Sequence, residues 1–261
     1  MISNKPPTMT PASSISSINH TIGDQEQIIQ FILRMFKWRQ LDFKGALTQM
    51  AQIIISPDTV YKNARNRKYI KDRYSRDDPA FVILLAIFML IIGLIYSITF
   101  HKLSLFNYVS LMSYLFLFDF LFIGIFISTI CWLICNKFLI DAESGGNNNQ
   151  ENVEWLYSFD VHTNSFIPVF ILLYVVQYTM LPILTMDNII GTSLSALLFM
   201  FAFSYYNYLT FKGYLNLTFI KNSEIFLYPI AVILVFTVVC IFTGFNCTKA
   251  VLSVYIDPKN N

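Results

Sequence analysis

The chain has 261 residues, of which 55% are hydrophobic and only 13% are charged, whereas about a quarter of the residues in a typical soluble domain are charged. This composition excludes an ordinary soluble protein, and the length excludes a second large globular domain beside a membrane-embedded one. The formal net charge of +2 is uninformative as a total, so the distribution of the charges has to be followed along the chain.

The first 24 residues are rich in Ser, Thr and Pro and contain no apolar core of the kind that a cleavable signal peptide needs. Such a composition buries too little apolar surface to offset the entropy cost of ordering. The sequence therefore predicts a disordered tail over 1–24, and it predicts that the first membrane span itself directs insertion.

Residues 25–79 are expected to form an amphipathic and basic helical region on the cytosolic side. Over 25–39, apolar residues share one wide face of a helix, opposite Gln30, Arg34 and Lys37. A basic strip opposite Trp and Phe suits a helix that lies among lipid headgroups, but packing against the membrane bundle explains the pattern equally well. A second helix is expected over 43–55, and a third begins at Ser56-Pro57-Asp58, where a cap residue precedes a proline at the first helical position.

Five long apolar segments follow. Each is about as long as the ~20 residues that cross a ~30 Å hydrocarbon core, and Asp119 is the one charged residue within them. They are 80–100, 109–135, 166–184, 189–211 and 225–245. The chain is thus predicted to be an all-α membrane protein with a five-span domain over 80–245 and a luminal tail over 246–261. The short interval between the third and fourth segments leaves a re-entrant hairpin as the alternative to two crossings.

The basic residues predict the orientation. With the N-terminus in the cytosol, the cytosolic segments 1–79, 136–165 and 212–224 carry 15 of the 18 basic residues, and three lie on the other side. Lys and Arg near span ends are retained on the cytoplasmic side. The acidic loop 136–165 does not change this prediction, because acids contribute little to orientation.

No motif for catalysis, a cofactor or a metal ion is recognisable. The cysteines at 131, 135, 240 and 247 lack paired metal-ligand spacing and are interpreted as buried apolar thiols. Gly-rich phosphate loops, nucleophile elbows and paired-carboxylate sites are missing from the sequence as well. The sequence therefore predicts a protein that is not an enzyme and has no cofactor and no metal site.

Several longer motifs resemble the Unc-fifty family of Golgi-resident multispanning proteins. They cover about residues 30–256 in order, and between them only the insert SGGNNNQ (144–150) reads as a flexible linker. The motifs are WRQLDF (38–43), SPDTVYKN (56–63), RKYIKDRYSRDDPAF (67–81), NKFLI (136–140), EWLYSFDVHTNSFIP (154–168), FKGY (211–214) and FLYPI (226–230).

The resemblance implies a multi-pass protein of the Golgi or the endoplasmic reticulum with five spans and no catalytic activity. It also implies a role in vesicle trafficking and protein transport, with receptor cargo and large guanine-nucleotide exchange factors for Arf GTPases as partners.

Asp119 is a candidate functional residue because charges inside a membrane span are costly. It suggests a small proton- or ion-coupled transporter or channel as the alternative function. The competing interpretation is a structural Asp119 that bonds a polar neighbour such as Gln177, Ser193, Ser204 or Asn207. The spans as drawn contain no second acid or base, which disfavours a proton relay.

A polar cluster precedes the third span, comprising Glu154, Asp160, His162 and Asn164. One His with dispersed carboxylates is a weak metal-site pattern. We expect these residues to form a hydrogen-bonded cap that serves the free N–H groups at the start of the third helix.

The basic stretch before the first span is a candidate surface for lipid or partner binding. Its members are Arg65, Arg67, Lys68, Lys71, Arg73 and Arg76. Attraction to an anionic cytosolic leaflet is the simpler account, and RNA binding by the interleaved tyrosines is a weaker one. Together with the acidic segment 151–160 this stretch could dock an exchange factor, or the two segments could pair with each other and stiffen the cytosolic face.

The sequence therefore favours a non-enzymatic trafficking factor or adaptor over a transporter built around Asp119. An enzyme acting on lipid is a third class, for which the sequence contains no suitable set of residues.

Overall fold

The computed structural model describes residues 25–100, 105–140 and 151–256. The predicted disordered tail and the 144–150 linker lie outside the described residues. Within these ranges the chain is helical, with an isolated bridge between Ile140 and Ile220 and no named strand. The expected all-α class is confirmed.

The N-terminal region is a chain of short helices. A helix over 25–35 is followed by η1 (Trp38–Gln40), α2 (Phe43–Ile55) and α3 (Pro57–Lys71). The Asp42 side chain caps α2 by accepting a hydrogen bond from the Gly45 N–H at 2.8 Å, and Pro57 starts α3 as expected. The first helix ends at residue 35, four residues before its expected end, because Lys37 adopts a non-helical backbone.

Among the described residues, five helices are long and apolar enough to cross a membrane, as predicted. They are Ala80–Phe100, Tyr108–Leu139, Trp155–Thr179, Ile189–Leu215 and Ser223–Thr243. The first is α4 (Ala80–Phe100) and the fourth is α10 (Ile189–Leu215). The second comprises α5 (Leu105–Ser113), η2 (Tyr114–Phe122), α6 (Ile123–Ile134) and η3 (Cys135–Leu139). The third comprises α7 (Trp155–Phe170), η4 (Ile171–Val176) and α8 (Gln177–Thr179). The fifth comprises η5 (Ser223–Leu227) and α11 (Tyr228–Thr243).

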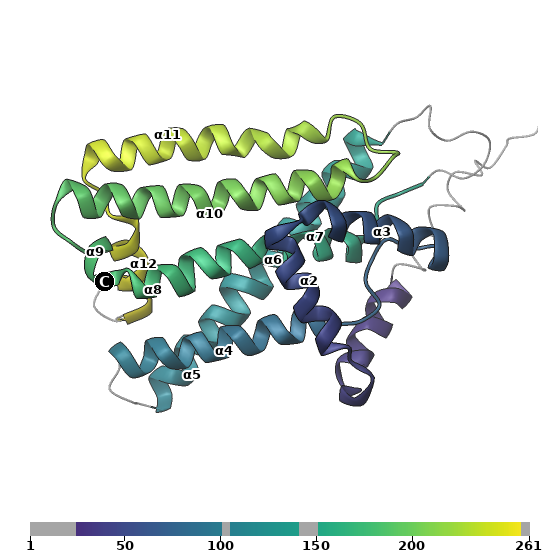
Figure 1. Cartoon of the computed structure of the whole chain (residues 1–261), viewed down its shortest axis with the longest axis horizontal. Helices are drawn as coiled ribbons and strands as arrows, with labels where there is room; N and C mark the ends of the chain where they lie inside the picture. Colours follow the sequence, from purple (N-terminus) through teal and green to yellow (C-terminus); the bar gives the residue numbers. More distant parts are fainter. Residues whose placement is uncertain (1–24, 101–104, 141–150, 257–261) are drawn as a thin grey trace, which may run out of the picture.

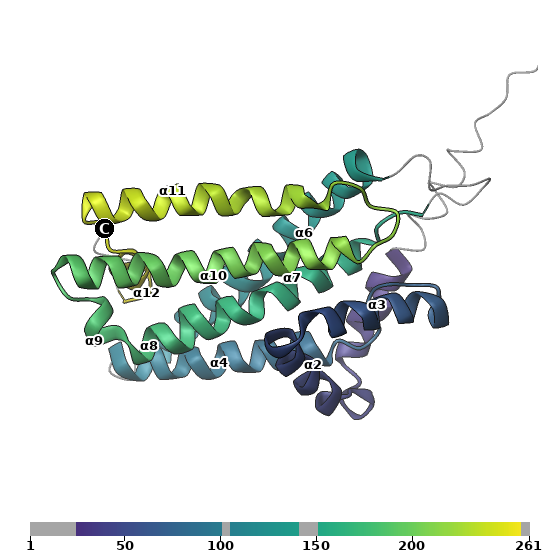
Figure 2. The same ribbon diagram turned by 45° about the horizontal axis from the view of Figure 1, so that its top comes forward.

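The long helices lie side by side and alternate in direction (Figures 1 and 2). The N-terminal helices α2 and α3 cover one end of the bundle, at the right of Figure 1, whereas α9 (Leu181–Leu184) and α12 (Cys247–Ile256) lie at the opposite end. The third and fourth long helices contain 25 and 27 residues, about 38–40 Å at 1.5 Å per residue. Each is long enough for a full crossing, which decides against the re-entrant hairpin.

The third span begins earlier than the sequence analysis placed it. Helix α7 starts at Trp155, not at Phe166, so the polar cluster from Asp160 to Asn164 is helical. In its most apolar window 78% of this span is buried, against 17% for the fifth span. Polar residues are tolerated in the third span because they face neighbouring helices and do not face lipid.

The expected luminal tail also needs correction, because residues 247–256 form α12. Thr248 of this helix is fully buried, and its N–H donates to Ser195 Oγ on α10 at 2.8 Å. The tail after the last span is therefore part of the packed bundle as far as the structure describes it.

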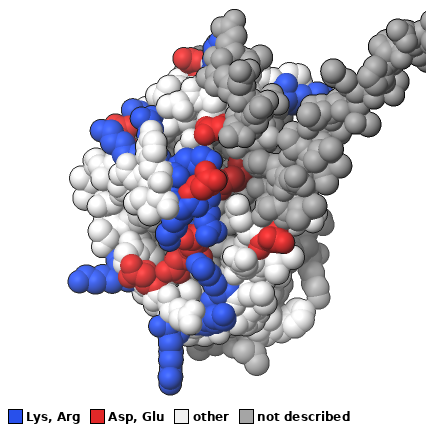
Figure 3. Space-filling view, turned by 90° about the vertical axis from the view of Figure 1, so that its right-hand side faces the viewer, with Lys and Arg blue, Asp and Glu red and all other residues white. Residues whose placement is uncertain are grey.

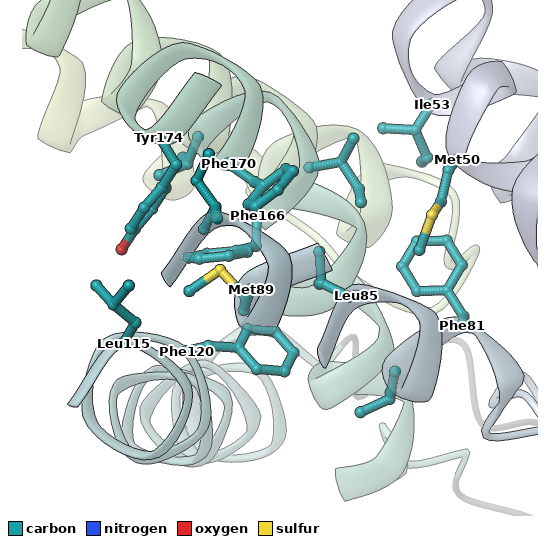
Figure 4. Close-up of a cluster of buried hydrophobic side chains, with 14 of the residues drawn as sticks. Met50, Ile53, Phe81, Leu85, Met89, Leu115, Phe120, Phe166, Phe170 and Tyr174 are labelled. Carbon is teal, nitrogen blue, oxygen red and sulfur yellow. The ribbon is translucent and has the colours of Figure 1, made fainter. Parts of the chain in front are cut away.

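The hydrophobic core joins the N-terminal helices to the bundle. Figure 4 shows Met50 and Ile53 of α2 beside Phe81 and Leu85 of α4, and Phe166 of α7 farther along the same cluster. The four cysteines are buried and free, in agreement with their interpretation as apolar thiols.

Candidate functional site

The segment between α3 and α4 is held by carboxylates from the start of α7. The N–H groups of Tyr74 and Ser75 donate to Glu154 Oε1 at 2.8 Å and to Glu154 Oε2 at 3.0 Å. The next N–H, of Arg76, donates to Asp160 Oδ2 at 2.5 Å. Two acidic side chains thus satisfy three successive backbone donors that a loop would otherwise leave unpaired at the membrane boundary.

The Arg76 side chain completes this arrangement. Its Nε lies 3.4 Å from Asp160 Oδ1, and its Nη2 donates to Asn164 Oδ1 at 2.5 Å. Its guanidinium also stacks 4.0 Å from the centre of the Phe81 ring. Arg76 is 7% exposed and Asp160 is 3% exposed, so the ion pair is shielded from water and stronger than a surface pair. We call Arg76, Glu154, Asp160 and Asn164 the anchor cluster.

The residues of the anchor cluster were expected to bond the free N–H groups at the start of α7, but they bond a different segment. Glu154 occupies the N-cap position of α7, but its side chain makes no capping hydrogen bond there. The carboxylates bind the N–H groups of residues 74–76 and leave those of α7 to other partners. The sequence identified the residues, but a partner segment about 80 positions away was not recognisable from local pattern.

His162 does not belong to the anchor cluster. Its Nδ1 is 2.7 Å from the hydroxyl of Tyr206 on α10, and its ring packs against Phe120 and Phe166. Gly124 is required beside it, because a Cβ there would lie 2.5 Å from His162 Nε2. Among the described residues, no group of three or more His, Cys, Asp or Glu side chains could hold a metal ion.

Two further basic residues bond backbone carbonyls within the protein. Arg65 donates to the carbonyl of Asn216 at 3.1 Å, and Arg67 donates twice to the carbonyl of Tyr74, at 3.2 and 2.9 Å. Burial lowers the pKa of Arg67 from its usual value. Arg65 thus links α3 to the end of α10, and Arg67 links α3 to the segment that the anchor cluster holds, so both have less freedom to bind a partner.

The remaining three basic residues lie at the surface. Lys68 pairs with Asp72 at 2.9 Å, and Lys71 and Arg73 both pair with Asp77, at 2.6 and 2.9 Å. Figure 3 shows this end of the molecule, where basic and acidic side chains lie side by side across the middle of the face. We call the exposed stretch 68–73 the α3 ridge; it includes Tyr69 and Ile70, which are 80% and 81% exposed.

The sequence left open whether helix 25–35 lies among lipid headgroups or packs against the bundle, and the structure combines features of both. Phe31 is buried in the main hydrophobic core. Ile29, Leu33 and Phe36 are 56%, 57% and 78% exposed. Phe31, with the partly buried Met35, therefore docks the segment on the bundle, and the exposed apolar positions remain available to lipid.

Asp119 lies in the π-helical segment η2, between two phenols. The hydroxyls of Tyr174 and Tyr255 both donate to its Oδ2, at 3.1 and 2.8 Å. Among the described residues, none of the four polar residues expected as its partners forms a hydrogen bond with Asp119. Tyr255 belongs to α12, so the segment expected as a tail supplies half of this site.

The longer third span also removes one argument against transport. It contains Asp160 and His162, so a second ionisable residue does exist within a span. The two sites are neighbours, because the His162 ring lies 6.0 Å from the ring of Phe120, the residue that follows Asp119. His162 nevertheless bonds Tyr206 and Asp119 bonds Tyr174 and Tyr255, and among the described residues no hydrogen bond joins His162 to Asp119.

Comparison with known proteins identifies the family. The chain matches the UNC-50 family over residues 31–256. The chain belongs to the UNC-50 family. The resemblance inferred from the motifs is thereby confirmed, and the match includes the helices between residue 31 and the end of α3, the anchor cluster and α12. We call the helical region 25–79, which covers one end of the bundle, the cap.

Individual UNC-50 relatives align over nearly their whole length. The chain is 39% identical to the protein unc-50 homolog of Dictyostelium discoideum over 228 residues, which cover 87% of each chain. It is 33% identical to the human protein unc-50 homolog over 261 residues, covering 95% of this chain and 98% of the human one. No solved structure matches the chain.

Proposed function

We propose that this UNC-50 protein is a non-enzymatic trafficking factor of the Golgi membrane whose cap recruits a large exchange factor for Arf GTPases and supports the transport of receptor cargo. In this proposal the cap faces the cytosol and the C-terminus faces the lumen. The proposal follows the family resemblance and the concentration of basic residues at the cap end, since positively charged segments are retained in the cytosol.

The observation that carries the proposal is the anchoring of the α3 ridge. At its far side, the hydroxyl of Tyr61 on α3 donates to the carbonyl of Leu209 on α10 at 2.9 Å. At its near side, the anchor cluster holds residues 74–76 on α7. A charged surface fixed at both sides loses little conformational entropy when it binds a partner.

The anchoring also reassigns the roles within the basic stretch. Arg65, Arg67 and Arg76 stabilise the cap, and their replacement would disturb its structure. Lys68 pairs with the exposed Asp72 and lies over the Tyr74 ring, and Lys71 and Arg73 pair with Asp77, whose side chain is 11% exposed. Within the described chain these three residues contact only groups of the same segment, so they are the residues to change when binding is tested.

The experiment is a triple charge reversal, Lys68→Glu, Lys71→Glu and Arg73→Glu, in cells depleted of the native protein. We expect the exchange factor to lose several-fold of its Golgi fluorescence while the variant itself still reaches the Golgi. A charge-matched control reverses Arg39, Lys44 and Lys62, which are also exposed on the cap but lie outside the ridge.

Tags at both ends, tested for protease protection in sealed vesicles, verify that each variant keeps its orientation. Unchanged recruitment by the ridge variant, with cargo delivery also unchanged, would contradict the docking proposal. Equal losses in the ridge variant and the control would point to general attraction between the cap and an anionic leaflet.

A further inference from the structure

A large apolar cavity lies inside the bundle, away from the cap. Its volume is about 670 Å³, within the 300–1,000 Å³ range of small-molecule sites. Its walls include Ile123, Ile127 and Ile130 on one face of α6, Phe199 and Phe203 of α10, and Ile233 of α11. The cavity is therefore built mainly from side chains that favour a hydrocarbon ligand.

The cavity lies next to the bilayer. Helix α11 packs along α10, and α6 packs along α7, but α6 and α11 do not pack closely against each other although both line the cavity. The exposed side chains of α11, such as Val232 and Phe236, show that this helix borders lipid. A ligand from the surrounding hydrocarbon can enter between α6 and α11 without crossing water.

One end of the cavity is polar and incompletely satisfied. Asp119, Tyr174, Gln177 and Tyr255 all line this end. Gln177 is 1% exposed, and neither its Oε1 nor its Nε2 has a hydrogen-bond partner among the described residues. A buried amide without partners is costly, and such a group in a native protein calls for a ligand or another explanation.

Polar residues farther along the cavity are paired to a greater extent. His162 Nδ1 bonds the Tyr206 hydroxyl and only its Nε2 is without a partner among the described residues, while Asn207 donates to the carbonyl of Phe203 at 2.8 Å. Gln177 is the lining residue with both a free donor and a free acceptor on one side chain. Gln177 is two positions from the end of the third span, so a headgroup bonded there sits close to the membrane surface on the α12 side.

The chemistry of the ligand follows from these contacts. A carboxamide offers one acceptor and a donor group, which a hydroxyl matches because it both donates and accepts. No Lys or Arg among the described residues lines the cavity, so a phosphate headgroup would lack a counter-charge. We propose that the cavity binds one neutral membrane lipid with a hydroxyl headgroup at Gln177 and its hydrocarbon body along α6 and α10.

Sterols and diacylglycerols share this chemistry, and the test separates them. The purified full chain in nanodiscs is exposed to photoactivatable cholesterol, diacylglycerol or phosphatidylcholine, and the crosslinked residues are mapped by mass spectrometry. We expect labelling on the cavity-facing side of α6 and α10 by one or both hydroxyl lipids. Phosphatidylcholine should label the outer face of α11.

Two variants and a control sharpen the test. Gln177→Leu removes the amide at nearly constant volume and leaves no bonded partner behind, so it should fold normally and lose several-fold of the cavity labelling. Ile127→Trp fills the cavity and should have the same effect. Val232→Trp adds the same bulk on the 69% exposed outer face of α11 and should leave labelling unchanged.

Equal cavity labelling by phosphatidylcholine and the hydroxyl lipids would overturn the proposed headgroup selectivity. Undiminished labelling in folded Gln177→Leu would overturn the role of the amide. Labelling confined to the outer faces of the helices would overturn the binding site itself. None of these readouts depends on recruitment of an exchange factor.

Discussion

The two ends of the bundle stabilise a buried ionisable residue in different ways. At the cap end, Arg76 is paired with Asp160 and carries further bonds to neutral groups. At the α12 end, Asp119 accepts hydrogen bonds from two tyrosine hydroxyls, and no lysine or arginine of the described chain forms an ion pair with it.

The difference follows from position along the membrane normal. Full charges are tolerated at the cap end because backbone N–H groups satisfy Glu154 and Asp160, and because Arg76 and Asp160 neutralise each other. Within a span the cost of a charge rises, and neutral hydroxyls satisfy a carboxyl group without adding a second charge. Both sites tie a terminal segment to the bundle, the first from the N-terminal side and the second from the C-terminal side.

The largest expected effect comes from breaking the Arg76–Asp160 pair. Arg76→Met should cost about 3–5 kcal/mol in the free energy of unfolding, because it leaves a buried carboxylate without its cation. Unfolding of the purified protein in detergent, followed by tryptophan fluorescence, measures the loss.

A double-mutant cycle with Asp160→Asn tests whether the two residues act as a pair. The combined variant should lose clearly less stability than the sum of the single losses, since it removes both charges. Strictly additive losses would show that Arg76 acts through its neutral partners and the Phe81 ring.

A smaller effect is expected at the α12 end. Tyr255→Phe removes one of the two hydrogen bonds to Asp119 and should cost about 1 kcal/mol, because Tyr174 still satisfies the carboxyl group. Proteolysis of a tag at the C-terminus and thermal unfolding report the loosening of α12 and the loss of stability.

The control is Tyr228→Phe, since Tyr228 is 68% exposed on α11. In a Tyr174→Phe background, Tyr255→Phe should cost more than it does alone, because Asp119 then loses both donors. An equal cost in both backgrounds would show that the two phenols do not share Asp119.

The smallest effect is expected on the α3 ridge. Lys68→Ala breaks a pair with Asp72, whose side chain is 94% exposed, and surface pairs of this kind contribute about 0–1 kcal/mol. The loss should disappear at 1 M salt, where screening is strong. A salt-independent loss of more than about 1 kcal/mol would show that Lys68 stabilises the cap as Arg65, Arg67 and Arg76 do.

The sequence alone was sufficient for the number of spans and for the helical class. For four of the five spans, both predicted ends lie within a few residues of the observed ends. Runs of about 20 apolar residues have no other stable environment, so they mark the spans clearly. The third span was the exception. Its first half contains Ser158, Asp160, His162 and Asn164, and a hydropathy pattern reads such residues as a loop.

For the candidate site, local pattern identified which residues are unusual but not what they contact. Asp119 stood out because a charge inside a span is costly, whereas Arg76 was expected to bind lipid or a partner and is instead buried in the anchor cluster. The helix start at Pro57 was predictable because the residues that begin a helix lie only a few positions apart in the sequence.

The sequence by itself determined the solvent of this protein, its family, and the concentration of basic residues on one side of its spans. Hydropathy and charge are properties of short segments, and they act before any helix meets another. Only the tertiary structure decided that Arg76 pairs with a residue 84 positions away and Tyr255 with one 136 positions away. Such contacts depend on which helix faces meet, and the bundle sets that geometry by packing all its helices together.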